Sequence, residues 1–126
     1  MKDKKKIKER TYEFGIEIID ISNKLPKNTA GYILGRQLLR SGTSIGANVE
    51  EATGAFSKDD FIFKINIALK EARETNYWLR LIKDSKMLRV TEMEEVLNEA
   101  ENIKNILSAI VKTSKERRDK SEVKCV

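Results

Sequence analysis

Apolar residues recur at helical spacing in four stretches of the chain. The first stretch covers residues 6–24. Its apolar residues Phe14, Ile18 and Ile21, together with Leu25 just after it, are spaced by four, three and four positions. Four amphipathic segments with short connections predict an all-α fold, a single-domain antiparallel up-down-up-down four-helix bundle. The other predicted seams are Leu34, Leu38, Ile45, Val49 and Ala52 in residues 29–53; Phe61, Ile65, Ala68, Ala72, Thr75, Leu79 and Ile82 in residues 57–86; and Met93, Val96, Ala100, Ile103, Leu107 and Ile110 in residues 91–117.

Residues that favour helix ends set the predicted boundaries. The first helix is expected to stop at Lys24, because Pro26 disfavours helical backbone at the residue before it. The second is expected to start with Asn28 or Thr29 as N-cap and to end before Gly54. The remaining start signals are Ser57 as N-cap, a hydrophobic contact between Phe56 and Phe61, and a capping box from Thr91 to Glu94.

Glycine is unexpectedly frequent in the second predicted helix. Each mid-helix glycine costs about 0.5–1 kcal/mol relative to alanine. Four of the chain's six glycines lie on one side of this helix, at spacings of four, seven and four. They indicate a close approach of another helix rather than a nucleotide-binding loop, because no glycine-rich phosphate motif follows a strand here. The predicted close-packing residues are Gly31, Gly35, Gly42 and Gly46.

A polar strip lies on the other side of the same predicted helix. Its side chains either face solvent or join a hydrogen-bonded network with Glu71 or Glu74 of the third helix, which would fix helix register more than stability. A catalytic or metal-binding carboxylate cluster is a third interpretation, but it would lack histidine ligands. The expected network consists of Arg40, Ser41, Ser44, Asn48, Glu51 and Glu74.

Some apolar residues lie outside the four seams. They form a second stripe on the first helix and another on the third. These stripes either widen the core of a monomer or form an interface between copies of the chain. The residues predicted for an oligomer interface are Tyr12, Ile16 and Ile19 in the first helix and Phe63, Ile67, Trp78 and Leu81 in the third.

The formal net charge of +5 is concentrated at the two ends of the chain. Residues 1–10 carry a net +4 and residues 112–126 a net +3, whereas residues 11–111 carry −2. We therefore divide the chain into a basic extension (1–9), a four-helix bundle (10–117) and a basic tail (118–126). The basic ends either serve solubility or bind nucleic-acid phosphates. The candidate phosphate contacts are Lys4, Lys5, Lys6, Lys8 and Arg10, with Lys115, Arg117, Arg118 and Lys120.

The composition excludes several kinds of site. The 126 residues include no histidine, so a Ser-His-Asp triad, a Cys-His pair and a His-ligated zinc are impossible. The single cysteine, Cys125, can form neither an intrachain disulfide nor a metal site. We therefore expect no catalytic residue, cofactor or metal. A lone cysteine and the lack of a signal segment or membrane span favour a cytoplasmic protein.

Three segments resemble a known bacterial family. They read "LPKN", "LGRQLLRSGTSIGANVEEATG" and "FIFKINIALKEARETNYWLRLI", and they are similar to the four-helix bundle family of 23S rRNA intervening-sequence proteins over roughly residues 10–112. Gly46 stands where that family often has proline, and Ala52 where it usually has glycine. The matching residues are Arg40, Ser44, Ile45, Asn48, Val49, Glu51, Glu74 and Leu79.

This resemblance implies a small cytoplasmic bundle, often a homopentamer, with no established enzymatic activity. Some members are encoded within insertions in ribosomal RNA genes. Distant relatives are accessory proteins of diversity-generating retroelements, which bind a reverse transcriptase and nucleic acid. The predicted function is a non-enzymatic, oligomeric accessory protein that binds RNA or DNA phosphates. The alternative is an interaction scaffold for another polypeptide, such as a reverse transcriptase.

Overall fold

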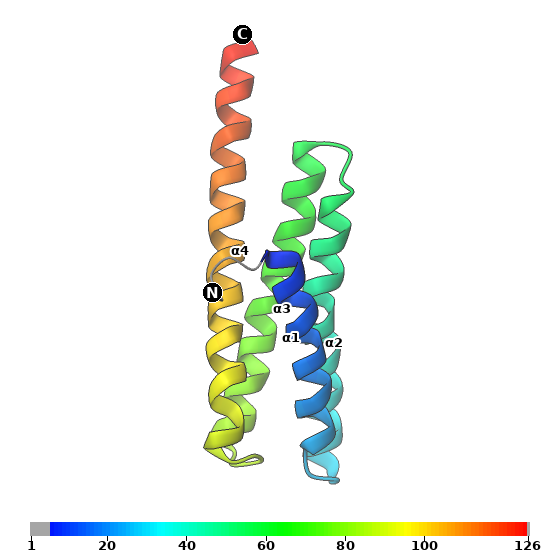
Figure 1. Cartoon of the computed structure of the whole chain (residues 1–126). Coiled ribbons are helices and arrows are strands. Elements are labelled where there is room, and N and C mark those ends of the chain that lie inside the picture. The colour runs from blue at the N-terminus through cyan, green and yellow to red at the C-terminus, as the bar shows by residue number, and fades with distance from the viewer. Residues whose placement is uncertain (1–5, 126) are drawn as a thin grey trace.

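Four long helices form the molecule (Figure 1). The computed structural model describes residues 6–125, with side chains as far as Lys120. The helices are α1 (Ile7–Lys24), α2 (Thr29–Thr53), α3 (Lys58–Asp84) and α4 (Val90–Cys125). Consecutive helices run antiparallel and pack against each other, and α4 also contacts α1. The predicted all-α four-helix bundle is confirmed.

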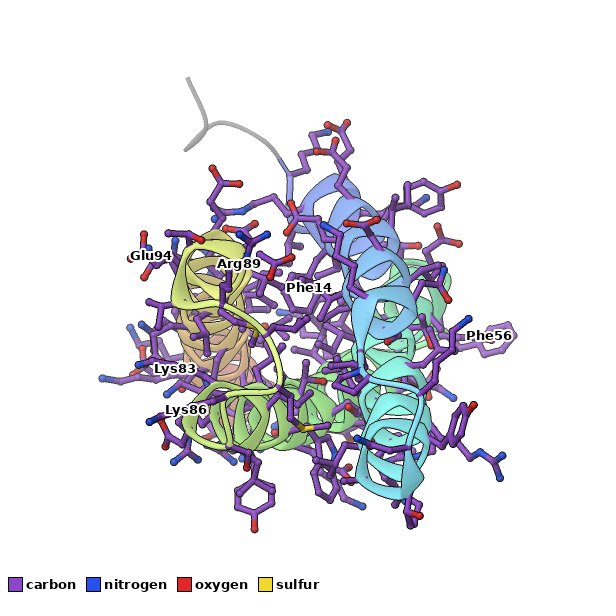
Figure 2. The ribbon with its side chains drawn as sticks, turned by 90° about the horizontal axis from the view of Figure 1, so that it is seen from below. Phe14, Phe56, Lys83, Lys86, Arg89 and Glu94 are labelled. Carbon is purple, nitrogen blue, oxygen red and sulfur yellow. The ribbon has the colours of Figure 1, made fainter. Side chains whose placement is uncertain are left out.

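The core follows the four predicted seams. Phe14, Ile18 and Leu38 are at most 1% exposed, and Phe14 points between the helices in the view along the bundle (Figure 2). Near the end of the fourth seam, Val111 is buried, whereas Ile110 is half-buried against the core. Hydrophobic periodicity thus identified nearly the whole core.

Two of the predicted N-caps are confirmed. The Asn28 side chain accepts a hydrogen bond from the Gly31 backbone N–H at 2.9 Å, and the Ser57 hydroxyl accepts one from the Asp60 N–H at 3.1 Å. Each cap satisfies a donor that has no partner within its helix. The predicted contact between Phe56 and Phe61 is wrong, because the Phe56 side chain is fully exposed and points away from the bundle (Figure 2).

The predicted capping box at the start of α4 is also wrong. The helix begins at Val90, so Thr91 lies inside it. The Glu92 carboxylate instead accepts a hydrogen bond from the Arg89 backbone N–H at 3.2 Å, which lowers the pKa of Glu92. The carboxylate that caps the start of α4 is therefore Glu92, two residues before the predicted Glu94. Glu94 is exposed, beside this turn (Figure 2).

The α3–α4 turn depends on one residue with left-handed backbone. Lys86 has a φ of 58°, and it lies just beyond the end of α3 (Figure 2). Its N–H donates to the Lys83 carbonyl at 3.0 Å, and the Met87 N–H donates to the Ile82 carbonyl at 3.2 Å. These two bonds form the motif that commonly closes a helix, with lysine in the place where glycine is usual.

The last helix is longer than predicted. We expected α4 to end near Arg117, but it continues to Cys125 and projects beyond the other three helices (Figure 1). Residues 112–125 contain no glycine or proline and are rich in lysine, arginine and glutamate, which favour helices. Part of the segment assigned to a basic tail is therefore helical, and α1 likewise begins at Ile7, within the assigned extension.

Candidate functional site

The basic residues at the start of α1 differ in their availability. Lys6 and Lys8 are exposed. The Arg10 guanidinium instead donates two hydrogen bonds to the Glu99 carboxylate of α4, at 2.7 and 3.0 Å, and its side chain is only 13% exposed. Arg10 therefore joins α1 to α4, and its expected role in phosphate binding conflicts with this bidentate pair. Lys4 and Lys5 lie outside the described residues.

The second basic cluster lies on the later turns of α4, from the level of the start of α3 onward. Lys115, Arg117 and Lys120 are exposed. The Arg118 guanidinium donates to Asp59 in the first turn of α3 at 3.0 Å and to Asp119 at 3.2 Å. The hydrogen bond with Asp59 is the main reason why the pKa of Arg118 is raised. Arg118 thus links α4 to α3, which leaves three free cations in this cluster.

The fold holds the two basic clusters apart. The Arg10–Glu99 ion pair places the start of α1 beside Glu99 of α4. Lys115 lies sixteen residues further along α4, which corresponds to about 24 Å at about 1.5 Å per residue. The candidate phosphate contacts therefore form two groups separated along the bundle, rather than a single site.

The polar strip of α2 forms an ion-pair bridge to α3. The Arg40 guanidinium donates to Glu71 at 3.0 Å and to Glu74 at 2.5 Å. Glu71 is only 7% exposed, so the guanidinium compensates a nearly buried carboxylate. The pKa of Arg40 is raised, mainly by the hydrogen bond with Glu74. Arg40 and Glu74 thus meet as the sequence suggested, with Glu71 beside them.

The same helix pair contains a buried hydroxyl contact. Ser41 and Thr75 are both fully buried, and their hydroxyl oxygens lie 2.9 Å apart. Ser44 and Asn48 instead donate to carbonyls of their own helix, and Glu51 is exposed. The bridge between the helices is therefore smaller than the predicted network. Thr75 belongs to the predicted apolar seam of the third helix and is not part of the predicted network. The available signal is a hydroxyl at a predicted buried position, because buried polar groups need partners.

The glycine side of α2 faces α1 and the turn that follows α1. A Cβ atom added at Gly42 would lie 2.7 Å from Ile18 Cγ2, closer than real contacts allow. The order of the contacts is antiparallel, so the glycines follow the whole length of the α1–α2 crossing. The other contacts of an added Cβ would be Gly31 with the Pro26 carbonyl, Gly35 with Leu25 Cδ1 at 3.2 Å, and Gly46 with the Thr11 carbonyl oxygen at 3.1 Å.

The second apolar stripe of α1 borders a groove. Tyr12, Ile16 and Ile19 are 64%, 54% and 46% exposed, and they line a groove of about 330 Å³ between α1 and α2. Gly15, one of the small residues in this groove, leaves room for another side chain, because no atom lies within 4 Å of the position of an added Cβ. This combination of large exposed side chains and a shallow groove is typical of a surface that binds another protein.

The second apolar stripe of α3 is less uniform. Phe63 is 60% exposed, whereas Ile67 and Leu81 are half-buried. Trp78 packs against the core of the same chain. Trp78 is half-buried like Ile67 and Leu81, because α3 packs against both α2 and α4 and so buries a wide face. This burial favours the interpretation in which the stripe widens the core, and a role of these residues in an interface stays a prediction.

Metal-binding clusters and membrane-spanning helices are both absent from the described part of the chain. Among the side chains of residues 6–120, no group of three or more aspartates and glutamates is arranged to hold a metal ion. None of the helices over residues 6–125 has the length and apolar character needed to cross a membrane.

The family of the chain follows from comparison with known proteins. A search of curated proteins found no match. The chain is similar to a crystal structure of a protein with unknown function from the S23 ribosomal protein family of Bacteroides thetaiotaomicron; the two are 40% identical, with a TM-score of 0.80, over 85% of this chain and 99% of the other. The model of the family described as 23S rRNA-intervening sequence protein matches residues 3–109. The expected resemblance is confirmed, and the chain belongs to the 23S rRNA-intervening sequence protein family.

Proposed function

We propose that the protein is a non-enzymatic accessory protein that binds nucleic-acid phosphates through the basic ends of its bundle. One observation carries this proposal: Lys6, Lys8, Lys115, Arg117 and Lys120 are exposed, and within the described part of the chain none of them has a carboxylate partner. Free cations on exposed helix surfaces are available to phosphates. Lys4 and Lys5, beyond the described residues, belong to the same proposal.

The geometry of α4 supports phosphate binding over sequence-specific recognition. Lys120 lies past the contact between Arg118 and the first turn of α3, on the part of α4 that extends beyond a body with a net charge of −2 over residues 11–111. Lysine contacts to phosphate oxygens position a protein on nucleic acid but do not distinguish bases. Binding should therefore depend weakly on sequence and strongly on salt, because each neutralised phosphate releases counterions.

Self-association is part of the proposal. The groove beside Tyr12, Ile16 and Ile19 offers an apolar surface to a second copy of the chain. An assembly, expected from the family resemblance to be a pentamer, would present several basic ends to one nucleic acid and raise its apparent affinity.

A four-lysine variant tests the proposal. We expect replacement of Lys6, Lys8, Lys115 and Lys120 by glutamine to weaken binding of a short single-stranded RNA by roughly tenfold or more at low salt. The salt slope should fall by up to about 2.8, since each phosphate contact contributes about 0.7. Filter-binding titrations of the full chain at two salt concentrations measure both quantities.

The matched control carries glutamine at four exposed lysines at the opposite end of the bundle. These residues are Lys24, Lys27, Lys83 and Lys86, in or next to the α1–α2 and α3–α4 turns, which lie at the lower end of Figure 1. The control changes the net charge equally, so it should bind more tightly than the terminal variant. Equal losses in both variants would mean that only overall charge matters, and the proposed role of the ends would be wrong.

An apolar groove favours a second candidate function, the binding of another polypeptide. The groove, of about 740 Å³, lies between the start of α3 and the second half of α4, and Phe61, Ile106 and Ile110 line it. It remains open because α1 begins beside Glu99 and does not reach this level of the bundle. A partner captured with little dependence on salt would favour this scaffold function, whereas steep salt dependence of RNA binding favours the first.

A further inference from the structure

A polar cleft of about 280 Å³ lies between α3 and α4, away from both basic ends. Its α3 residues are spaced by three and four positions, and the first and last of its α4 residues are four apart, so each helix turns one face into the cleft. None of the candidate phosphate contacts at the basic ends lies on this surface. The lining residues are Arg73, Asn76 and Arg80 of α3 and Lys104, Asn105 and Ser108 of α4.

Two arginines of the cleft have no acidic partner. Arg73 and Arg80 are exposed, and neither forms an ion pair with any residue between 6 and 120. The Arg80 Nε donates to the Asn76 carbonyl oxygen at 2.9 Å, which holds this guanidinium at the cleft. Four other arginines of the chain do bind carboxylates: Arg10 with Glu99, Arg40 with Glu71 and Glu74, Arg89 with Glu92, and Arg118 with Asp59 and Asp119.

The cleft remains positively charged after its acidic neighbour is included. The Lys104 Nζ lies 2.8 Å from one oxygen of Glu101, and the Asn76 amide donates to the other oxygen at 3.4 Å. Three cations and this carboxylate leave a local charge of +2, in a body whose net charge is −2. Like charges held close together repel each other, and a bound anion would relieve that repulsion.

An aromatic side chain adjoins the cations. Tyr77 is 47% exposed, and the Arg80 guanidinium carbon lies 5.8 Å from the centre of its ring. The Trp78 ring, which packs against the core, meets the Tyr77 ring edge-on, with centres 5.1 Å apart, and so supports it. An exposed, supported aromatic ring beside arginines offers a stacking surface for an unpaired base.

We propose that this cleft is a second nucleic-acid site, which binds single-stranded RNA or DNA. Arg73, Arg80 and Lys104 contact phosphodiester oxygens, and Tyr77 stacks on a base. Asn105 and Ser108 lie on the opposite wall and supply neutral hydrogen-bonding groups. The inference rests on the proposed nucleic-acid function but uses none of the residues at the basic ends.

A charge-removing variant of the full chain tests the phosphate contacts. We expect Arg73→Gln with Arg80→Gln to weaken binding of a short single-stranded RNA by about tenfold and to lower the salt slope by about 1.4, the contribution of two phosphates. Neither change breaks an ion pair, so thermal melts should stay close to those of the parent. The matched control, Arg36→Gln with Lys27→Gln, removes two exposed cations from α2 and its preceding turn and should leave affinity and slope nearly unchanged.

A variant that leaves the charge unchanged tests the stacking contact separately. Stacking of one base on an aromatic side chain is worth about 1–3 kcal/mol, so Tyr77→Leu should weaken binding by about fivefold or more. Its salt slope should remain that of the parent, because no phosphate contact is lost. Tyr77→Phe keeps the ring and should bind like the parent.

The outcomes separate this inference from the role of the basic ends. If the cleft variant binds like its control while the four-lysine variant loses affinity, the cleft proposal is wrong and the ends remain. If only the cleft variant loses affinity, the proposal for the cleft is supported and the proposed role of the basic ends is wrong. Failure of the parent to bind both single-stranded RNA and single-stranded DNA at low salt would exclude both proposals. Amide NMR shifts with inorganic pyrophosphate that RNA does not displace would assign the cleft to small anions, which also overturns the proposal.

Discussion

At the scale of single residues, four glycines of α2 set how closely α1 can approach. Gly42 faces Ile18, which is completely buried and so has no free space into which to move. Gly15 lies in the middle of α1, where an added Cβ would meet no atom within 4 Å. The two glycines therefore have the same intrinsic cost in a helix but opposite surroundings.

We expect opposite effects from alanine at these two positions. Gly15→Ala should raise the free energy of unfolding by about 0.5–1 kcal/mol, because alanine favours the helix. Gly42→Ala should lower it, since overpacking typically costs about 1–3 kcal/mol and outweighs the same gain. Urea denaturation of both variants measures the difference. A stabilised Gly42→Ala would show that the α1–α2 crossing can open without cost.

At the scale of helices, polar pairs determine the register of α2 against α3. The hydroxyls of Ser41 and Thr75 meet in the core, and Arg40 bridges to Glu71 one turn away. A shift of either helix along its axis would separate both pairs and leave buried groups without partners. Such pairs restrict the alternatives more than they add to stability.

We expect Arg40→Met to destabilise the protein by about 1–2 kcal/mol. The value lies below that of a fully buried pair, because the Arg40 side chain is 48% exposed. The main cause is the Glu71 carboxylate, which would remain nearly buried without its cation. Adding Glu71→Gln to this variant should recover part of the loss, and Arg36→Met is the exposed control. If the double variant is no more stable than Arg40→Met, Glu71 does not depend on Arg40.

At the scale of the whole molecule, the exposed apolar stripe of α1 and the groove beside it indicate an association surface. We expect the full chain to have a mass in solution several times its 14.5 kDa, as measured by light scattering during size exclusion. Ile16→Glu, inside the stripe, should shift the protein toward the monomer, because it places a charge in an apolar interface.

The matched control for this prediction is Ile33→Glu on α2. Ile33 and Ile16 are similarly exposed, at 57% and 54%, but Ile33 lies about 21 Å along α2 from Ala47 of the groove, at about 1.5 Å per residue. The control should keep the parent's mass. A parent that is monomeric at micromolar concentration, or equal dissociation of both variants, would contradict the predicted interface.

The sequence by itself determined the elements of this protein. Hydrophobic periodicity located four helices and nearly all of the core, and Asn28 and Ser57 marked two helix starts, because these signals depend on residues within one or two turns. The motif around Arg40 was enough to indicate the family. The predicted end of α4 near Arg117 was wrong. No hydrophobic periodicity marks the basic segment beyond it, but the segment also has no helix-breaking residue, and the helix continues to Cys125.

Only the tertiary structure decided which charged residues are available for binding. Arg10 and Arg118 looked like their basic neighbours, yet Glu99 and Asp59, each more than fifty positions away, hold them in ion pairs. Arg73 and Arg80, inside a slightly acidic body, remain free at a cleft that exists only because α4 packs antiparallel to α3. The physical reason is that an ion pair depends on distance in space, which the register of packed helices sets and which neighbours along the chain do not reveal.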